Sequence, residues 1–139
     1  MAFRPYLFFG GNCREAFTRY QEIFGGELFV MGAGDMPSDE PVPAGKEDLV
    51  IHAALMFDGH LLMASDVFDT DAFAGVHGTY VNFTTPDLAE ARRVYDALAE
   101  GAEVEMAFEP TFWSPGFGSL RDRFGTLWMV RADQPAGAA

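Results

Sequence analysis

Two stretches of the chain, 75 residues apart, repeat one pattern of apolar and polar positions. Asn12 in the first stretch corresponds to Asp87 in the second, and Tyr20 corresponds to Tyr95. In both stretches apolar residues recur at the spacing of a helix with one buried face, and glycine follows the last of them. Asn12 and Asp87 can each accept hydrogen bonds from the free N–H groups of a first turn. The pattern therefore predicts two equivalent amphipathic helices.

A second repeat, at a spacing of 66 residues, joins two segments with glycine at a turn. Gly59 corresponds to Gly125, and Met63 corresponds to Met129. Alternating apolar residues on either side of a glycine turn are typical of β-hairpins. With the turn at Gly59, Ala54 is expected to pair with Met63. The shorter spacing of this repeat means that the first half has more residues between its helix and its hairpin.

Each half is expected to run in the order strand, helix, strand, strand, strand. The predicted strands lie near 3–9, 27–33, 48–57, 60–66, 78–84, 103–109, 117–122 and 127–131. This order predicts an α+β fold of two βαβββ modules in tandem, with mixed sheets and the helices on the outside. The chain is expected to form one domain, 1–139, with module one at about 1–66 and module two at about 77–131. Residues 34–47, rich in proline and glycine, are expected to be mobile or to act as a lid.

Composition and charge narrow the classes of partner. The formal net charge is -12, which argues against binding to nucleic acid or to an anionic membrane surface. A cationic organic ligand is compatible with this charge. No apolar run approaches the roughly 18 residues of a membrane span, and no signal peptide is recognised. A single cysteine, Cys13, fits a reducing cytoplasm.

Several local stretches point to one family. They are Gly11–Asn12–Cys13, Phe24–Gly25–Gly26, Ile51-His52-Ala53-Ala54-Leu55, Leu62-Met63-Ala64-Ser65-Asp66, Thr111-Phe112-Trp113, Phe117-Gly118 and the run from Asp122 to Trp128. Together with the duplicated βαβββ order, they resemble the vicinal oxygen chelate (glyoxalase/bleomycin resistance protein/dioxygenase) superfamily, and in particular its PhnB-like branch. The resemblance implies curved sheets that enclose a cavity. It does not fix an activity, because this superfamily includes isomerases, dioxygenases, thiol transferases and drug-binding proteins.

The resemblance also maps the metal-ligand positions of the superfamily onto this chain. The four positions are Pro5, Met63, Tyr80 and Met129. The ligands usual in the superfamily are histidine and glutamate, and none of the four residues here is a plausible ligand for a divalent ion. The sequence therefore predicts no bound metal. It also predicts no cofactor, because the glycines near Phe9 lack the spacing of a dinucleotide fingerprint.

Strand alternation extends the expected cavity face beyond the four mapped positions. The candidate ligand-binding residues are His52, Met63, Ser65, Tyr80, Asn82, Trp113 and Met129. The same alternation places Leu7 and Phe9 on the cavity face beside Pro5. Apolar walls with a few polar groups are typical of a small-molecule site. Structural roles stay open: His52 is equally consistent with a hydrogen-bonded core histidine, and Trp113 either covers the cavity mouth or packs against a partner subunit.

The function predicted first is metal-independent binding of a small organic molecule. The alternative is a metal-dependent enzyme of the same superfamily, an isomerase, lyase or dioxygenase, and the missing ligand set argues against it. A third interpretation is an interaction protein whose cavity is filled by its own side chains. The apolar strands also need cover, which predicts a homodimer.

Overall fold

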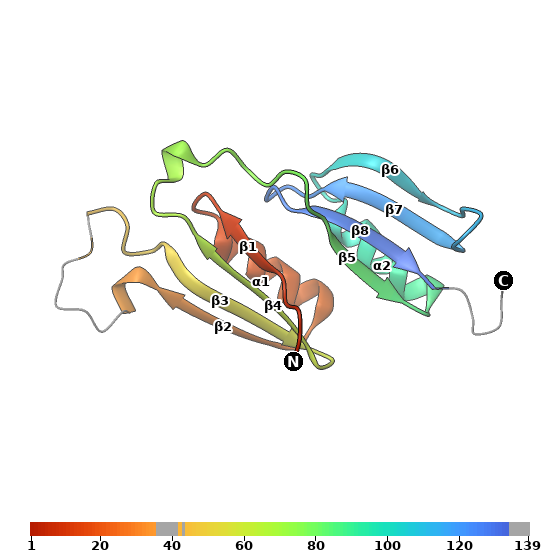
Figure 1. The fold of residues 1–139 in the computed structure, drawn as a ribbon, viewed down its shortest axis with the longest axis horizontal. Helices are drawn as coiled ribbons and strands as arrows, with labels where there is room; N and C mark the ends of the chain where they lie inside the picture. The colour runs from red at the N-terminus through yellow and green to blue at the C-terminus, as the bar shows by residue number, and fades with distance from the viewer. Residues whose placement is uncertain (36–41, 43, 134–139) are drawn as a thin grey trace. The chain divides into compact units, whose positions relative to one another are not determined.

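The computed structural model describes residues 1–35, 42 and 44–133, which divide into two units, Met1–Gly75 and Val76–Ala139 (Figure 1). The first unit contains β1 (Tyr6–Phe9), α1 (Cys13–Phe24), β2 (Glu27–Gly32), η1 (Ala33–Asp35), β3 (Val50–Phe57), β4 (His60–Asp66) and η2 (Thr70–Ala72). The second contains β5 (Val81–Thr85), α2 (Leu88–Leu98), β6 (Glu103–Glu109), β7 (Gly116–Arg121) and β8 (Leu127–Ala132). Each unit therefore has the expected order of strand, helix and three strands.

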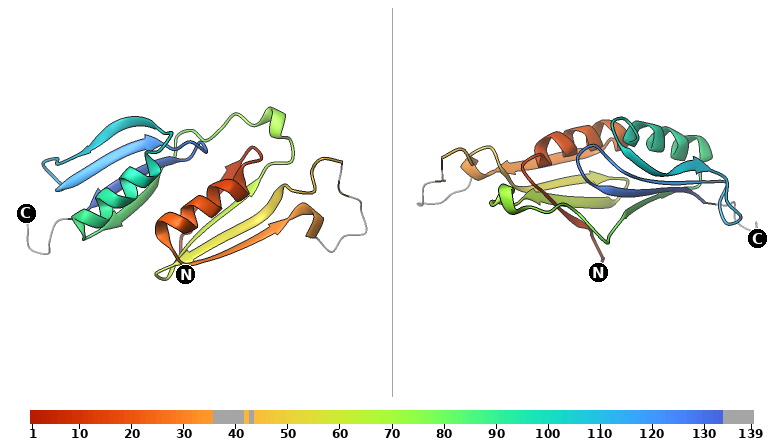
Figure 2. Two further views of the ribbon diagram at one scale, coloured as in Figure 1. Left: turned by 180° about the vertical axis from the view of Figure 1, so that it is seen from behind. Right: turned by 90° about the horizontal axis from the view of Figure 1, so that it is seen from above.

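The two sheets have the same topology. Their strand orders are β1-β4-β3-β2 and β5-β8-β7-β6. In each sheet the first strand pairs parallel with the last, and the other pairs are antiparallel. Each helix lies across one face of its own sheet (Figure 2). The predicted α+β fold of tandem βαβββ modules is confirmed.

The helix stripes predicted from sequence form the cores of the two units. In α1, Phe17 and Tyr20 are fully buried, and Phe17 packs edge-on against Phe9 of β1 with 6.1 Å between ring centroids. In α2, Val94 and Tyr95 are buried against the second sheet. Apolar residues at helical spacing on one side of each helix thus bury one face of the sheet and leave the other face without a helix.

The turn between β3 and β4 matches the expectation from sequence. Asp58 and Gly59 have φ values of 49° and 77°, so both central residues are left-handed, as in a type I′ turn. The pairing of Ala54 with Met63 is confirmed. The turn between β7 and β8 is longer, since the last strand pair joins Arg121 to Leu127.

A carboxylate from β4 caps the first helix, which corrects the prediction for Asn12. The side chain of Asn12 makes no capping hydrogen bond. Instead Asp66 Oδ1 accepts from the backbone N–H groups of Gly11 and Cys13, both at 3.0 Å. Asp66 Oδ2 accepts from Val50 N at 2.8 Å, where β3 begins. In the second unit the expected cap is confirmed, because Asp87 Oδ1 accepts from the N–H groups of α2.

A second buried carboxylate organises the β7–β8 turn. Asp122 Oδ1 accepts from Phe124 N and Thr126 N, both at 2.9 Å. Asp122 Oδ2 accepts from the indole N–H of Trp128 at 2.8 Å. Trp128 is 2% exposed and therefore belongs to the core of the second unit.

Half of the segment predicted to be mobile, 34–47, lies outside the described residues. Its positions 36–41 and 43 are not described, and neither is the tail 134–139. The prediction of a lid in this segment therefore stays a prediction.

Replacing Asp66 with asparagine is expected to lower the free energy of unfolding by about 2–3 kcal/mol, because the variant loses charge-assisted hydrogen bonds to three N–H groups at the starts of α1 and β3. The measurement is urea denaturation followed by circular dichroism. The matched control is Asp71→Asn, an exposed carboxylate in η2, which is expected to cost less than about 0.5 kcal/mol. Equal losses in the two variants would contradict the capping role of Asp66.

Candidate functional site

The seven residues predicted to contact a ligand lie on the side of each sheet that the helix does not cover. They are His52 on β3, Met63 and Ser65 on β4, Tyr80 before β5, Asn82 on β5, Trp113 in the β6–β7 loop and Met129 on β8. We call this side the open face of each sheet. The structure brings His52, Met63 and Ser65 together in the first unit and the other four in the second. Contact with a ligand stays a prediction for all seven.

The open face of the first sheet carries an aromatic group centred on His52. The phenol oxygen of Tyr6 lies 3.3 Å from His52 Nδ1, and the two rings stack at 5.8 Å between centroids. The ring of Phe29 on β2 lies beside the imidazole, with 6.5 Å between the ring centroids. The ring of Phe8 lies beside that of Tyr6, with 5.5 Å between the centroids. Because Tyr6 and Phe29 hold the imidazole from two sides, His52 is a positioned polar group on an otherwise apolar surface.

The sequence prediction was wrong about which residues of β1 face this surface. Leu7 and Phe9 are buried on the helix side, with exposed fractions of 7% and 2%. The residue beside Met63 in the sheet is Tyr6, and the residue beside Ser65 is Phe8. Tyr6, Phe8 and Phe29 were therefore missed.

The error has a local cause in the turn that precedes each helix. Two residues, Gly10 and Gly11, separate β1 from Asn12, whereas Pro86 alone separates β5 from Asp87. A spacing of 75 that aligns the helices therefore misaligns the first strands by one residue, which exchanges the two faces of a strand. A doubled glycine turn was the signal that could have revealed this insertion.

The corrected register changes which residues of this chain occupy the metal-ligand positions of the vicinal oxygen chelate superfamily. Tyr6 takes the place assigned to Pro5, and Asn82, the neighbour of Met129, takes the place assigned to Tyr80. A phenol, an amide and two thioethers do not form a ligand set for a hard or borderline divalent ion. Among residues 1–35, 42 and 44–133, no three His, Cys, Asp or Glu side chains cluster as a metal site.

Tyr80 closes one end of the open face of the second sheet. Its hydroxyl donates to Glu105 Oε1 at 2.8 Å. A shift of register between Val104 and Met106 makes Glu105 an extra residue in β6, and such a bulge re-aims the side chains around it. The hydrogen bond to Glu105 raises the pKa of Tyr80 above its ordinary value, so the phenol stays protonated. Tyr80 is thus engaged with a neighbour rather than turned freely toward a ligand.

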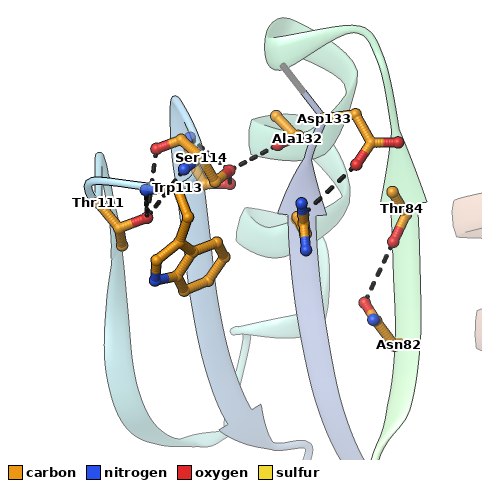
Figure 3. Close-up of polar contacts among 9 residues, drawn as sticks. Asn82, Thr84, Thr111, Trp113, Ser114, Ala132 and Asp133 are labelled. Carbon is orange, nitrogen blue, oxygen red and sulfur yellow. Dashed lines mark hydrogen bonds and ion pairs between the residues drawn. The ribbon is translucent and has the colours of Figure 1, made fainter. Parts of the chain in front are cut away.

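Asn82 is exposed on β5. Its Oδ1 accepts a hydrogen bond from the Thr84 hydroxyl at 3.3 Å, two residues along the same face (Figure 3). The amide oxygen thus has a partner within the strand, and the amide N–H₂ group can donate a hydrogen bond to an acceptor atom of a ligand.

Trp113 is held in place by its own loop. The Thr111 hydroxyl accepts from Trp113 N and Ser114 N at 3.3 and 3.0 Å, and the buried Ser114 hydroxyl donates to Ala132 O on β8 (Figure 3). The indole packs edge-on against Phe117 with centroids 4.7 Å apart. Trp113 therefore lies on the open face of its own sheet. The two functional interpretations given for it, ligand cover or subunit contact, both stay open.

Cys13 does not have the properties of a nucleophile. It is fully buried at the start of α1. Burial raises the pKa of its thiol to about 12, and the negative charge of Asp66 acts in the same direction. The thiol is therefore protonated at neutral pH, and the favourable effect of the helix dipole is outweighed.

Comparison with known proteins places this chain among relatives that it matches along nearly its whole length. The sequence profile of the Glyoxalase/Bleomycin resistance protein/Dioxygenase superfamily matches residues 3–130. Protein YjdN of Escherichia coli K12 is 35% identical over 143 residues, which cover 94% of each chain.

Two solved structures extend the comparison. Protein PA1353 from Pseudomonas aeruginosa is 42% identical with a TM-score of 0.88, covering 97% of this chain and 99% of that one. The putative 3-demethylubiquinone-9 3-methyltransferase PhnB protein from Bacillus cereus is 26% identical with a TM-score of 0.76, covering 95% and 99%. The chain belongs to the glyoxalase/bleomycin resistance protein/dioxygenase superfamily, and within it to the PhnB-like branch.

Proposed function

We propose that this protein binds a small organic molecule without a metal ion. The observation that carries the proposal is the exposed apolar surface on the open face of the first sheet. Phe8, Phe29 and Met56 are 50%, 52% and 53% exposed there, around the positioned imidazole of His52. A surface of apolar walls with one oriented polar group is the composition of a small-molecule site.

The energy available on this surface is sufficient for a ligand. Full burial of one phenylalanine or methionine side chain contributes about 1.5–3 kcal/mol. A ligand that covers the remaining exposed area of three such side chains would gain several kcal/mol before the cost of its own immobilisation. His52 adds direction, because Tyr6 fixes the ring and a hydrogen bond to a ligand then needs little further ordering.

The enzyme alternative is less well supported by the residues of this chain. A metal-dependent isomerase, lyase or dioxygenase needs imidazole or carboxylate ligands, and Tyr6, Met63, Asn82 and Met129 supply neither. The name of the Bacillus cereus relative includes a methyltransferase activity, which belongs to that protein. In this chain the turn at Gly10 and Gly11 packs against Phe73 and binds the carboxylate of Asp66, so it offers no cradle for a cofactor.

We also propose that the protein is a cytoplasmic homodimer. The buried, protonated thiol of Cys13 fits a reducing compartment. Among the described residues, no helix is long and apolar enough to cross a bilayer. A second copy would cover those apolar residues that the ligand leaves exposed.

The metal-independent character is tested by elemental analysis of protein purified without an affinity tag. We expect no stoichiometric metal, and no rise in melting temperature on titration with zinc, nickel, manganese or ferrous iron, because apolar side chains cannot replace the hydration of an ion. One tightly held ion per chain, lost in the His52→Ala variant, would overturn both the assignment of the open face and the proposed function.

The binding site is tested by a thermal-shift screen of small molecules, followed by calorimetry of the compounds that stabilise the protein. Replacing His52 with alanine is expected to weaken binding by about tenfold, which is the loss of one oriented hydrogen bond. The matched control is His60→Ala, an exposed histidine beside the Asp58–Gly59 turn. A compound whose affinity falls equally in both variants would contradict a site at His52.

The homodimer is tested by light scattering over micromolar concentrations. We expect twice the monomer mass, because a stable interface buries more than about 1,000 Å² and the exposed Phe8 and Phe29 can supply apolar area. The Phe29→Asp variant should dissociate at a higher protein concentration. A monomer at all concentrations of the unaltered protein would contradict the prediction.

A further inference from the structure

The open face of the second sheet carries a cation whose hydrogen-bonding capacity is largely unused. Arg131 on β8 is in register with Thr84 of β5 and with Phe117 of β7. Its guanidinium lies 5.2 Å from the centre of the Trp113 ring, and its side chain is 39% exposed. The residue is therefore positioned by an aromatic ring and by the sheet, with part of the guanidinium open to a ligand.

The acidic partner of Arg131 does not saturate it. Arg131 Nε lies 3.4 Å from Asp133 Oδ1, which is an ion pair. The same Nε is buried and forms no hydrogen bond within the described part of the chain. Within the described residues, no side chain or carbonyl accepts a hydrogen bond from Nη1 or Nη2, the two terminal nitrogens of Arg131. These nitrogens carry four N–H groups in one plane, the arrangement that binds a carboxylate through two parallel hydrogen bonds.

A second donor lies on the same face, one strand away. Asn82 is in register with Met129, two residues before Arg131 on β8, so the amide and the guanidinium occupy diagonal positions. The hydroxyl of Thr84 donates to the amide oxygen of Asn82, and no described group accepts from the amide N–H₂. A guanidinium and a neighbouring N–H₂ group, both of which can donate, define a site for an acceptor with more than one oxygen.

The other charged residues on β6 and β7 include Glu103, which is in register with Arg121. Glu105 accepts from Tyr80, and Arg121 donates to Gly125 O at 3.0 Å. Glu109 lies at the β6 edge, in register with Phe117. Between these groups lie Met106, which is 50% exposed, and the half-buried Met129, with the buried Ser119 in register between them.

We propose that Arg131 and Asn82 bind the carboxylate of a monoanionic organic acid whose apolar part lies on Met106 and Met129. This inference goes beyond the proposed function, because it places a second site on the open face of the second sheet and names the chemical class of the ligand there. The site suits a ligand with one negative charge better than a ligand with two. Asp133 already offsets part of the charge of Arg131, and the net charge of the chain is -12, so each further negative charge on the ligand is repelled. A dianion such as a phosphate ester would meet more repulsion. The negative net charge of the chain attracts cations in general, but the group that contacts Arg131 is determined by the positive charge of this side chain.

The test uses three probes with one shape: cyclohexanecarboxylate, cyclohexanecarboxamide and cyclohexylmethylamine. They present an anion, a neutral amide and a cation on the same apolar ring. Affinity is measured by calorimetry at constant ionic strength, with methyl phosphate as a dianionic comparison. We expect the carboxylate to bind about tenfold more tightly than the carboxamide, since charge-assisted hydrogen bonds to a guanidinium form only with the acid.

Matched variants locate the effect. Arg131→Gln should remove the preference for carboxylate over carboxamide, and Asn82→Asp should reverse it in favour of the amine. The control, Arg123→Gln, changes the net charge equally at a side chain of equal exposure, 40%, in the β7–β8 turn. It should leave the preference unchanged. A preference that survives in Arg131→Gln, or that is lost equally in the control, would overturn the proposal.

Tryptophan fluorescence gives an independent reading. The chain has two tryptophans, and Trp128 is buried and bonded to Asp122, so only Trp113 should respond to a ligand at Arg131. The carboxylate should change the emission of the unaltered protein and not that of Trp113→Phe. The absence of any response to carboxylate, or tighter binding of the amine or of methyl phosphate, would overturn the proposal. The library screen at His52 would still test the binding function, because it does not depend on Arg131.

Discussion

The first unit depends on the carboxylate of Asp66. Its two oxygens bind backbone N–H groups at the start of α1 and at the start of β3, while its own strand ends beside β1. Four segments are thereby joined at one buried point. A buried carboxylate without hydrogen bonds would lower the free energy of unfolding, so the stability of the unit depends on the three hydrogen bonds that Asp66 accepts. In the second unit the carboxylate of Asp122 joins separate groups in a similar way. It accepts hydrogen bonds from backbone N–H groups of the β7–β8 turn and from the indole of the core residue Trp128.

These buried carboxylates fix the helix side of each sheet and leave the opposite side available. A βαβββ unit has one helix, which can bury only one face of a four-stranded sheet. The apolar residues on the other face, such as Phe8 and Phe29, are consequently exposed within the described structure. Their exposure is unfavourable in water unless a ligand or a second subunit covers them. The proposed function is therefore a consequence of the architecture as well as of particular residues.

The residues on the open faces differ from the histidine and glutamate ligands that are usual in the superfamily. The positions beside Met63 and Met129 hold Tyr6 and Asn82, so neither sheet presents a histidine or carboxylate pair at these places. Polar groups lie instead at His52, which Tyr6 orients, and at Arg131, which packs on Trp113. Each is a polar group on a mostly apolar surface, a composition that is typical of small-molecule sites.

The sequence by itself determined the period of each element, the duplicated order of strands and helices, the Asp58–Gly59 turn and the superfamily. These depend on local spacing, which a single chain displays directly. Only the tertiary structure decided that Tyr6 rather than Leu7 lies on the open face, because alternation fixes the period of a strand and not its phase. It alone paired Asp66 with the start of a helix 53 residues away, turned Glu105 toward Tyr80 through a bulge, and placed Trp113 on Arg131. These contacts join segments that are remote in sequence, and their partners are chosen by the packing of the sheet.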